Sequence, residues 1–274
     1  MRLVNAIERE TGLAAPLTAL FVDDTIAGLA RVLRDGAADL KAPIVNLHHE
    51  GTLPPFVFLH GDFTGGGFYS RALAHQLGPE RPVLIVHPHG LVDMAIPETI
   101  EAMAADRLRA LRELRPRGPY VLGGHCNGAL VAFEMARQLL GAGEDVPAVV
   151  VIEARAPAGN GAGESAGGEA YVTVGPHGGI RVMVAHDRQS DAHLRYSKAI
   201  DRYAGGPCAT HAVIVRSEKL ADPRRDLGWS RLARSFEVHD MPGDHVTLIT
   251  RHVGKLAEVV RAAITGAFDP AEQR

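Results

Sequence analysis

Residues 120–135 read Tyr-Val-Leu-Gly-Gly-His-Cys-Asn-Gly-Ala-Leu-Val-Ala-Phe-Glu-Met. An apolar strand, a cysteine between glycines and a helix-forming run follow one another here. The segment Gly124-His125-Cys126-Asn127-Gly128 has the Gly-x-nucleophile-x-Gly form of a nucleophile elbow, a sharp strand-to-helix turn that exposes a reactive side chain. Glycines are needed because Cβ atoms beside the turn would collide with the adjoining strand and helix. The turn places Cys126 at a helix N-terminus, where unpaired amides and the helix dipole favour a thiolate.

A second match to the same pattern, residues 163–167, contains the more common serine. It lies in a Gly-rich stretch, with no apolar strand before it and no helix after it, so we expect Ser165 not to be a nucleophile. Cys126 as an inert buried thiol is the alternative that its strand–turn–helix context disfavours. With only one other cysteine, Cys208, the chain has too few thiols for a disulfide framework or a four-thiolate zinc site.

Outward from the elbow, predicted strands alternate with predicted helices. The strands are expected at 44–47, 56–59, 83–86, 120–122, 148–152, 212–215 and 236–239. Helices are expected at 68–77, 98–114 and 129–140, and a closing helix is expected from the apolar stripe Ile249, Val253, Leu256, Val260 and Ile264. Continuous Val/Ile runs and this alternation predict a mostly parallel central sheet with helices on both faces.

Two segments stand outside that alternation. Residues 1–36 predict two helices, the first ended by Thr11-Gly12 and the second capped by Asp24-Thr25, and residues 37–42 are expected to be a linker to a domain at 43–274. About residues 154–190 the pattern gives way to a Gly-rich insertion with a predicted β-hairpin at 171–174 and 180–184. We interpret this insertion as a lid over a site rather than as a surface excursion.

Composition excludes several functional classes. The chain has 274 residues, 29 Lys and Arg against 32 Asp and Glu, and a formal charge of −3. This balance disfavours nucleic acid and a polybasic membrane anchor as partners. The longest apolar run, Ala148 to Ile152, is too short to span a bilayer, and the N-terminus lacks an apolar signal core. We therefore expect a soluble, cytoplasmic protein.

A thiol nucleophile needs a base, and the chain has 14 histidines. We favour His245, because it follows a predicted strand in a tight loop, residues 241–244, just before the closing helix. A loop at the end of a late strand is where a parallel sheet can deliver an imidazole to the elbow.

The third member of such a site is a carboxylate that orients the imidazole. Glu153 is favoured because it comes directly after five buried apolar residues, where a carboxylate needs a partner. The alternative for Glu153 is a structural ion pair with Arg155. The rival carboxylates follow the strand at 212–215: Glu218, Asp222 and Asp226.

The strand at 56–59 runs into His60, Gly61, Asp62 and a glycine-rich loop. The backbone amide of Gly61 or Asp62 is expected to pair with the amide of Asn127 as an oxyanion hole. The glycine run lacks the Gly-Lys-Ser/Thr and Rossmann spacings of phosphate-binding loops. His87-x-His89 is half of a metal-site spacing that no carboxylate or thiol completes, so no metal is assigned.

These features together resemble a type I thioesterase domain, the α/β-hydrolase that terminates nonribosomal peptide and polyketide assembly lines. The likeness covers residues 43 to about 267 and rests on Pro54-Pro55-Phe56-Val57-Phe58-Leu59-His60-Gly61, Pro119-Tyr120-Val121-Leu122-Gly123-Gly124-His125, Phe133-Glu134-Met135-Ala136 and Pro242-Gly243-Asp244-His245. The resemblance implies an α/β-hydrolase fold with a lid insertion. It also favours Glu153, since the family's acid commonly follows the strand after the elbow, although Asp is usual there.

Residues 2–36 resemble the latter part of a carrier domain. In that interpretation the serine that bears phosphopantetheine lies before Met1, so we expect the chain to be a piece of a larger synthetase. The resemblance implies no cofactor in the thioesterase domain itself and a substrate delivered on the phosphopantetheine of the upstream carrier domain, its expected partner.

The family usually has serine where this chain has Cys126. A thiol passes an acyl group from one thioester to another, so the acyl group stays activated. Cysteine-bearing members resemble a subset associated with strained four-membered lactam or lactone products. The expected function is a chain-terminating thioesterase that leans to intramolecular cyclisation. The alternatives are hydrolytic release or editing by the same site, and a carrier-docking module without catalysis.

Overall fold

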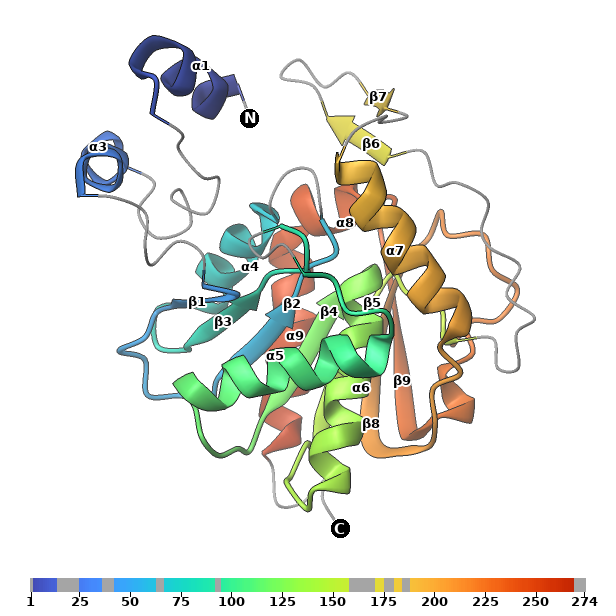
Figure 1. Cartoon of the computed structure of the whole chain (residues 1–274). Helices are drawn as coiled ribbons and strands as arrows, with labels where there is room; N and C mark the ends of the chain where they lie inside the picture. The colour runs from blue at the N-terminus through green and yellow to red at the C-terminus, as the bar shows by residue number, and fades with distance from the viewer. Residues whose placement is uncertain are drawn as a thin grey trace.

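The structure is a computed structural model, and its fold is built on one central β-sheet. It describes residues 2–13, 25–35, 42–62, 67–91, 95–157, 171–174, 180–183 and 188–268. Seven of the described strands form this sheet in the order β1-β3-β2-β4-β5-β8-β9 (Figure 1). Their bounds are β1 (Ile44–Leu47), β2 (Phe56–Leu59), β3 (Val83–Val86), β4 (Val121–His125), β5 (Ala148–Ile152), β8 (Cys208–Ser217) and β9 (Ala233–Met241). Neighbouring strands run parallel except that β1 is antiparallel to β3. The predicted mostly parallel sheet is confirmed.

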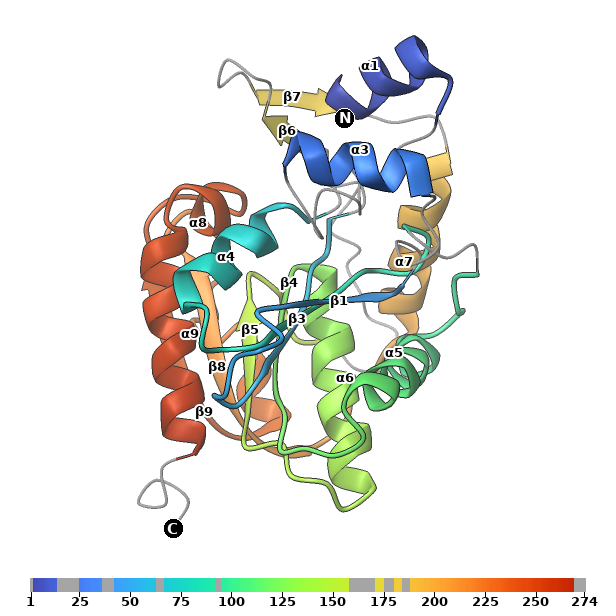
Figure 2. The ribbon, with the colours of Figure 1, turned by 90° about the vertical axis from the view of Figure 1, so that its left-hand side faces the viewer.

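Helices cover both faces of the sheet, as Figure 2 shows. One face packs against α5 (Ile100–Leu114), α6 (Asn127–Gly141) and α7 (Arg188–Arg202). The other packs against α4 (Tyr69–Leu77), α8 (Thr247–Thr250) and α9 (Val253–Ala267). Alternate side chains of β2 enter the two cores, since Val57 and Leu59 lie in the first and Phe56 and Phe58 in the second. Burial on both faces explains the continuous apolar strands.

Four strands have the bounds that the sequence predicted: β1, β2, β3 and β5. β4 extends past its predicted end through Gly123 and Gly124, which favour turns in isolation. A Cβ at Gly123 would lie 2.6 Å from the ring of Phe56. Glycine is therefore required inside this strand because an aromatic ring occupies the space of its side chain.

Two helical features differ from the sequence expectation. The closing helix is divided into α8 and α9, with His252 as the N-cap of α9. Helix α7 was not predicted, although its buried Tyr196 and Ala199, with Tyr203 just beyond it, have helical spacing. The hydroxyl of Tyr203 donates to the buried Glu134 carboxylate on α6 at 2.9 Å. This bond fixes the end of α7 against the core.

The N-terminal segment contains the two predicted helices, α1 (Arg2–Thr11) and α3 (Ile26–Asp35). Gly12 has φ +71° directly after α1, and the Thr25 hydroxyl accepts the N–H of Gly28 at 2.9 Å as an N-cap. That these helices end a carrier domain stays a prediction. None of the described helices is long and apolar enough to cross a bilayer.

The predicted hairpin in the insertion is confirmed, since β6 (Tyr171–Val174) pairs antiparallel with β7 (Ile180–Met183). Residues 158–170, 175–179 and 184–187 lie outside the described residues, as do residues 37–41 of the predicted linker. The second pattern match, with Ser165, falls in this part. The lid role of the insertion stays a prediction.

The first turn of α6 tests this packing. A Cβ at Gly128 would collide with the backbone oxygen of Leu59 on β2, whereas a Cβ at Gly141, at the other end of α6, meets nothing within 4 Å. Gly128→Ala is expected to lower the free energy of unfolding by about 1–3 kcal/mol, because backbone cannot yield as a side chain does. Gly141→Ala is expected to raise it by up to about 1 kcal/mol through helix propensity. Chemical denaturation measures both; equal effects would contradict the packing described.

Candidate active site

Cys126 lies on a sharp turn between β4 and α6. Its backbone has φ 55° and ψ −131°, a conformation that side-chain-bearing residues rarely adopt. Two hydrogen bonds hold it: the N–H of Cys126 donates to the carbonyl of Ile152, and its carbonyl accepts from the N–H of Ala129, both at 3.0 Å. A Cβ at Gly124 would lie 2.5 Å from the backbone nitrogen of Ala129. The structure thus has the predicted elbow geometry, with the Cys126 side chain half-buried.

His245 lies in the loop between β9 and α8, beside Cys126. Its Nδ1 is 3.4 Å from Oε2 of Glu153. Although burial lowers the pKa of His245, hydrogen bonds to Cys126 and Glu153 raise it to about 10. Asp244 holds the residues that follow, because its Oδ1 accepts the N–H groups of Val246 at 3.2 Å and Thr247 at 2.9 Å.

Glu153 follows β5 with φ 54°, and its side chain is 1% exposed. Its Oε1 accepts the backbone N–H of Ser217 on β8, and its own N–H donates to the carbonyl of Val215 at 2.9 Å. Oε2 faces His245. The alternative partner, Arg155, instead donates from Nε to Asp222 at 2.7 Å. Cys126, His245 and Glu153 are therefore brought together from three different elements.

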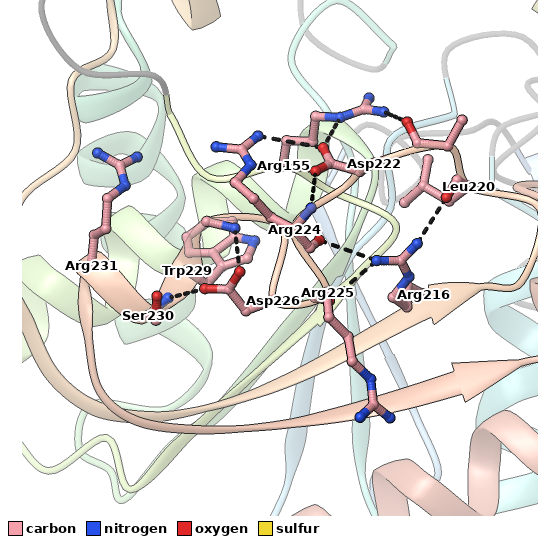
Figure 3. A network of polar contacts seen from close by, with 12 residues as sticks. Arg155, Arg216, Leu220, Asp222, Arg224, Arg225, Asp226, Trp229, Ser230 and Arg231 are labelled. Carbon is pink, nitrogen blue, oxygen red and sulfur yellow. Dashed lines mark hydrogen bonds and ion pairs between the residues drawn. The ribbon is translucent and has the colours of Figure 1, made fainter.

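The rival carboxylates bind other groups, as Figure 3 shows for Asp222 and Asp226. Burial raises the pKa of Asp222, but hydrogen bonds from Arg224 and Arg155 lower it to about 2. Asp226 accepts the N–H groups of Gly228 and Ser230 at 3.2 and 3.1 Å and so caps a turn. The remaining rival is Glu218, whose Oε1 accepts the N–H of Gly243 at 3.3 Å.

The loop after β2 lies against the elbow. A Cβ at Gly61 would be 3.0 Å from Cβ of Cys126 and 3.1 Å from the backbone nitrogen of Asn127. Asn127 is the first residue of α6, where an amide has no partner within the helix. The amide of Asp62 donates to Nδ1 of His60 at 3.3 Å. The structure thus brings Gly61 and Asn127 together and directs the Asp62 amide toward His60.

Three polar residues near this site, His60, His125 and Tyr69, were not assigned a role from the sequence. His60 Nε2 lies 2.7 Å from Nδ1 of His87, and His125 lies between Tyr69 and His245. His125 could have been singled out, because it precedes the cysteine of the elbow. Tyr69 carries no local signal, since only the packing of α4 brings it to the site.

Metal-binding geometry is absent from the described ranges, in which no group of three or more His, Cys, Asp or Glu residues could hold a metal ion. Of the two histidines in the His-x-His spacing, His87 forms a hydrogen bond with His60. The second, His89, has Nε2 2.9 Å from Oδ2 of Asp106.

Comparison with known proteins agrees with this geometry. Residues 56–175 match the family model described as "Thioesterase domain". The NocB thioesterase domain from the nocardicin cluster superimposes with a TM-score of 0.62 and 21% identity, over 82% of this chain and 99% of that one. The chain has the α/β-hydrolase fold of thioesterase domains, and residues 56–175 are similar to that family. The thioesterase domain titled for the cyclisation of surfactin has a TM-score of 0.56 and 20% identity, over 82% of this chain and 98% of its own.

Curated relatives of the thioesterase domain are much longer proteins. Indigoidine synthases of Streptomyces lavendulae and Dickeya dadantii are 36% and 34% identical over 57% of this chain, which corresponds to 12% and 10% of their lengths. A dimodular nonribosomal peptide synthase of Bacillus subtilis is 31% identical over 56% of the chain and 6% of its own length. The chain thus spans only 6–12% of the length of these three relatives.

One solved structure matches more of the chain. A four-domain nonribosomal peptide synthetase bound to AMP and glycine has a TM-score of 0.70 and 22% identity, over 95% of this chain and 23% of that one.

The charge on Glu153 is predicted to control the protonation of His245. In Glu153→Gln, which keeps the shape of the side chain, the pKa of His245 is expected to fall by about 1–3 units, measured by NMR titration of the ring protons. The folded-state pKa of about 10 lies above the ordinary 6.5, so the protonated pair stabilises the fold fully below pH 6.5 and loses this effect as the pH rises to 10. The free energy of unfolding of the variant should therefore lie below that of the unmodified protein at neutral pH and approach it as the pH rises toward 10. An unchanged pKa would contradict the pairing.

Proposed function

We propose that this domain is a chain-terminating thioesterase that takes a peptidyl or acyl group from a carrier-bound phosphopantetheine thioester onto Cys126 and releases it. The observation that carries the proposal is the convergence of a strained, half-buried cysteine, an imidazole that interacts with it and a buried carboxylate facing that imidazole. A nucleophile, a base and a group that orients the base are the parts that acyl transfer requires.

The first half-reaction transfers the acyl group to the enzyme. The Cys126 sulfur attacks the thioester carbonyl carbon, and the carbon–sulfur bond to pantetheine breaks. The proton that His245 takes from Cys126 passes to the leaving pantetheine thiolate. The amides of Asn127 and of Gly61 or Asp62 hold the oxygen that becomes negative in between. The Asp62 amide, now directed at His60, would have to turn to take part.

The second half-reaction releases the product. An amine or hydroxyl of the acyl chain, or water, loses a proton to His245 and attacks the carbonyl of the Cys126 thioester. The new bond forms as the carbon–sulfur bond breaks, and His245 returns the proton to the sulfur. The buried carboxylate of Glu153 stabilises the imidazolium between these steps.

Sulfur at position 126 supports the lean to cyclisation. A serine would convert the incoming thioester into a more stable oxoester, whereas a cysteine keeps the acyl group at nearly the same energy. Amines attack thioesters more readily than water does. We therefore favour ring closure by an internal amine or hydroxyl, including a strained lactam or lactone, over hydrolytic release or editing.

The carrier partner is part of the same proposal. We infer that α1 and α3 end a carrier domain whose phosphopantetheine delivers the substrate. A solved synthetase match over 95% of the chain extends beyond residues 43–274 into this segment, which supports the inference.

Cysteine substitution tests the proposal. Cys126→Ala is expected to abolish release of acyl groups from acyl-pantetheine thioesters, measured by the appearance of free thiol. Cys208→Ala is the matched control, because Cys208 is buried on β8, where burial raises its pKa to about 11. Its rate should equal that of the unmodified protein. Undiminished turnover of Cys126→Ala would end the hypothesis.

The acceptor is tested with Cys126→Ser. If sulfur favours ring closure, the serine variant should give a lower ratio of cyclic or aminolysed product to hydrolysed acid, by mass spectrometry of the released products from an amine-bearing acyl-pantetheine. An unchanged ratio would contradict the role of sulfur in ring closure, and free acid as the sole product of the unmodified protein would favour hydrolytic release.

A further inference from the structure

Beside the three proposed catalytic side chains, two other residues join distant parts of the chain. The hydroxyl oxygen of Tyr69, on α4, lies 3.1 Å from Nδ1 of His125, at the end of β4. Nε2 of His125 lies 3.2 Å from the carbonyl oxygen of His245. Three elements that are far apart in the sequence are thus connected at the residue proposed as the base.

Each bond in this series has one chemically allowed direction. A carbonyl oxygen only accepts, so Nε2 of His125 carries a proton and donates it to His245. Burial, then the nearby His245, lower the pKa of His125 well below its ordinary value, so the ring is neutral and its Nδ1 accepts. Burial, then the charges of Asp62 and Cys126, raise the pKa of Tyr69, so its hydroxyl keeps the proton that it donates. The bonds run from Tyr69 through His125 to His245.

The ring of His245 is also in contact with His125. The two ring centroids are 4.5 Å apart, with the planes tilted by 33°. His245 needs such support, because its side chain is 42% exposed and its Nδ1 is 3.4 Å from Glu153, longer than an ordinary hydrogen bond. Asp244 bonds the amides after His245, whereas His125 bonds the carbonyl of His245 itself.

We propose that Tyr69 and His125 are positioning residues, which hold His245 through its carbonyl oxygen and one face of its ring so that its two nitrogens face Glu153 and Cys126. This role rests on the proposed function, in which His245 is the base. It differs from core packing alone, which would affect folding but not the protonation of His245 or the reactivity of Cys126. Among the described residues, the titratable groups that face His125 are Tyr69, His245 and His60.

Three variants separate the two roles. Tyr69→Phe removes only the donating hydroxyl, and His125→Phe removes both ring nitrogens but keeps a flat ring. His125→Gln is the conservative variant, since its side-chain amide can still donate to the carbonyl of His245. Tyr120→Phe is the matched control, because the Tyr120 hydroxyl also donates to a backbone carbonyl, that of Arg115 at 2.7 Å, at the other end of β4.

The measurements are the rate of Cys126 alkylation by iodoacetamide, the rate of acylation by acetyl-pantetheine and the pKa of His245 by NMR, all in a Cys208→Ala background. We expect Tyr69→Phe and His125→Phe to slow alkylation and acylation about tenfold, because a misplaced base loses its geometry. The pKa of His245 should fall by about one unit as its bonds to Glu153 and Cys126 loosen. His125→Gln should keep most of both properties, and Tyr120→Phe should change neither.

Unchanged rates and an unchanged His245 pKa in Tyr69→Phe and His125→Phe, with lowered unfolding midpoints, would overturn the positioning role and leave packing. Failure of the proposed function has a different signature. In that case acetyl-pantetheine does not acylate the unmodified protein, while the alkylation rates and the His245 pKa still report on positioning.

Discussion

The backbone at Cys126 is the constraint on which the active site depends. A positive φ at a residue with a side chain is strained, and it persists because the surroundings leave no alternative. The Cys126 amide is bonded to the end of β5, and its carbonyl to the first turn of α6. Gly124 and Gly128 let α6 approach both β4 and β2, at distances that a Cβ would not permit. The strain is thus held by packing of the central sheet.

Sheet topology brings the other groups to the same end. Glu153 follows β5, which pairs parallel with β4, and the loop with Gly61 follows β2 on the other side of β4. β9, whose following loop holds His245, lies further along the sheet, so this loop must return toward the elbow. Asp244 bonds one side of the loop and His125 the carbonyl of His245. Burial of the Glu153 carboxylate makes its attraction for a protonated imidazole strong, because little water screens it.

Local patterns predicted most of this architecture. Four strands matched their predicted ranges because each is a short, mostly β-branched, aromatic or leucine run, which is typical of a buried strand. The elbow was predicted from glycines around one cysteine. The placement of Glu153 beside His245 agrees with the sequence argument, although their catalytic roles stay predictions. Helix α7 was missed because its N-terminal half is mostly polar and lies at the end of the long predicted insertion. The contacts of Tyr69 could not be predicted, since they depend on how α4 packs and not on any spacing in the chain.

The central claim is that sulfur at position 126 carries the acyl group, and a covalent adduct tests it most directly. After incubation with an acyl-pantetheine thioester and rapid acid quenching, intact-mass measurement should show one added acyl group. Peptide mapping should place it on Cys126, and neutral hydroxylamine should remove it, as expected for a thioester. An unmodified Cys126, or an adduct on another side chain while product is being released, would contradict the account.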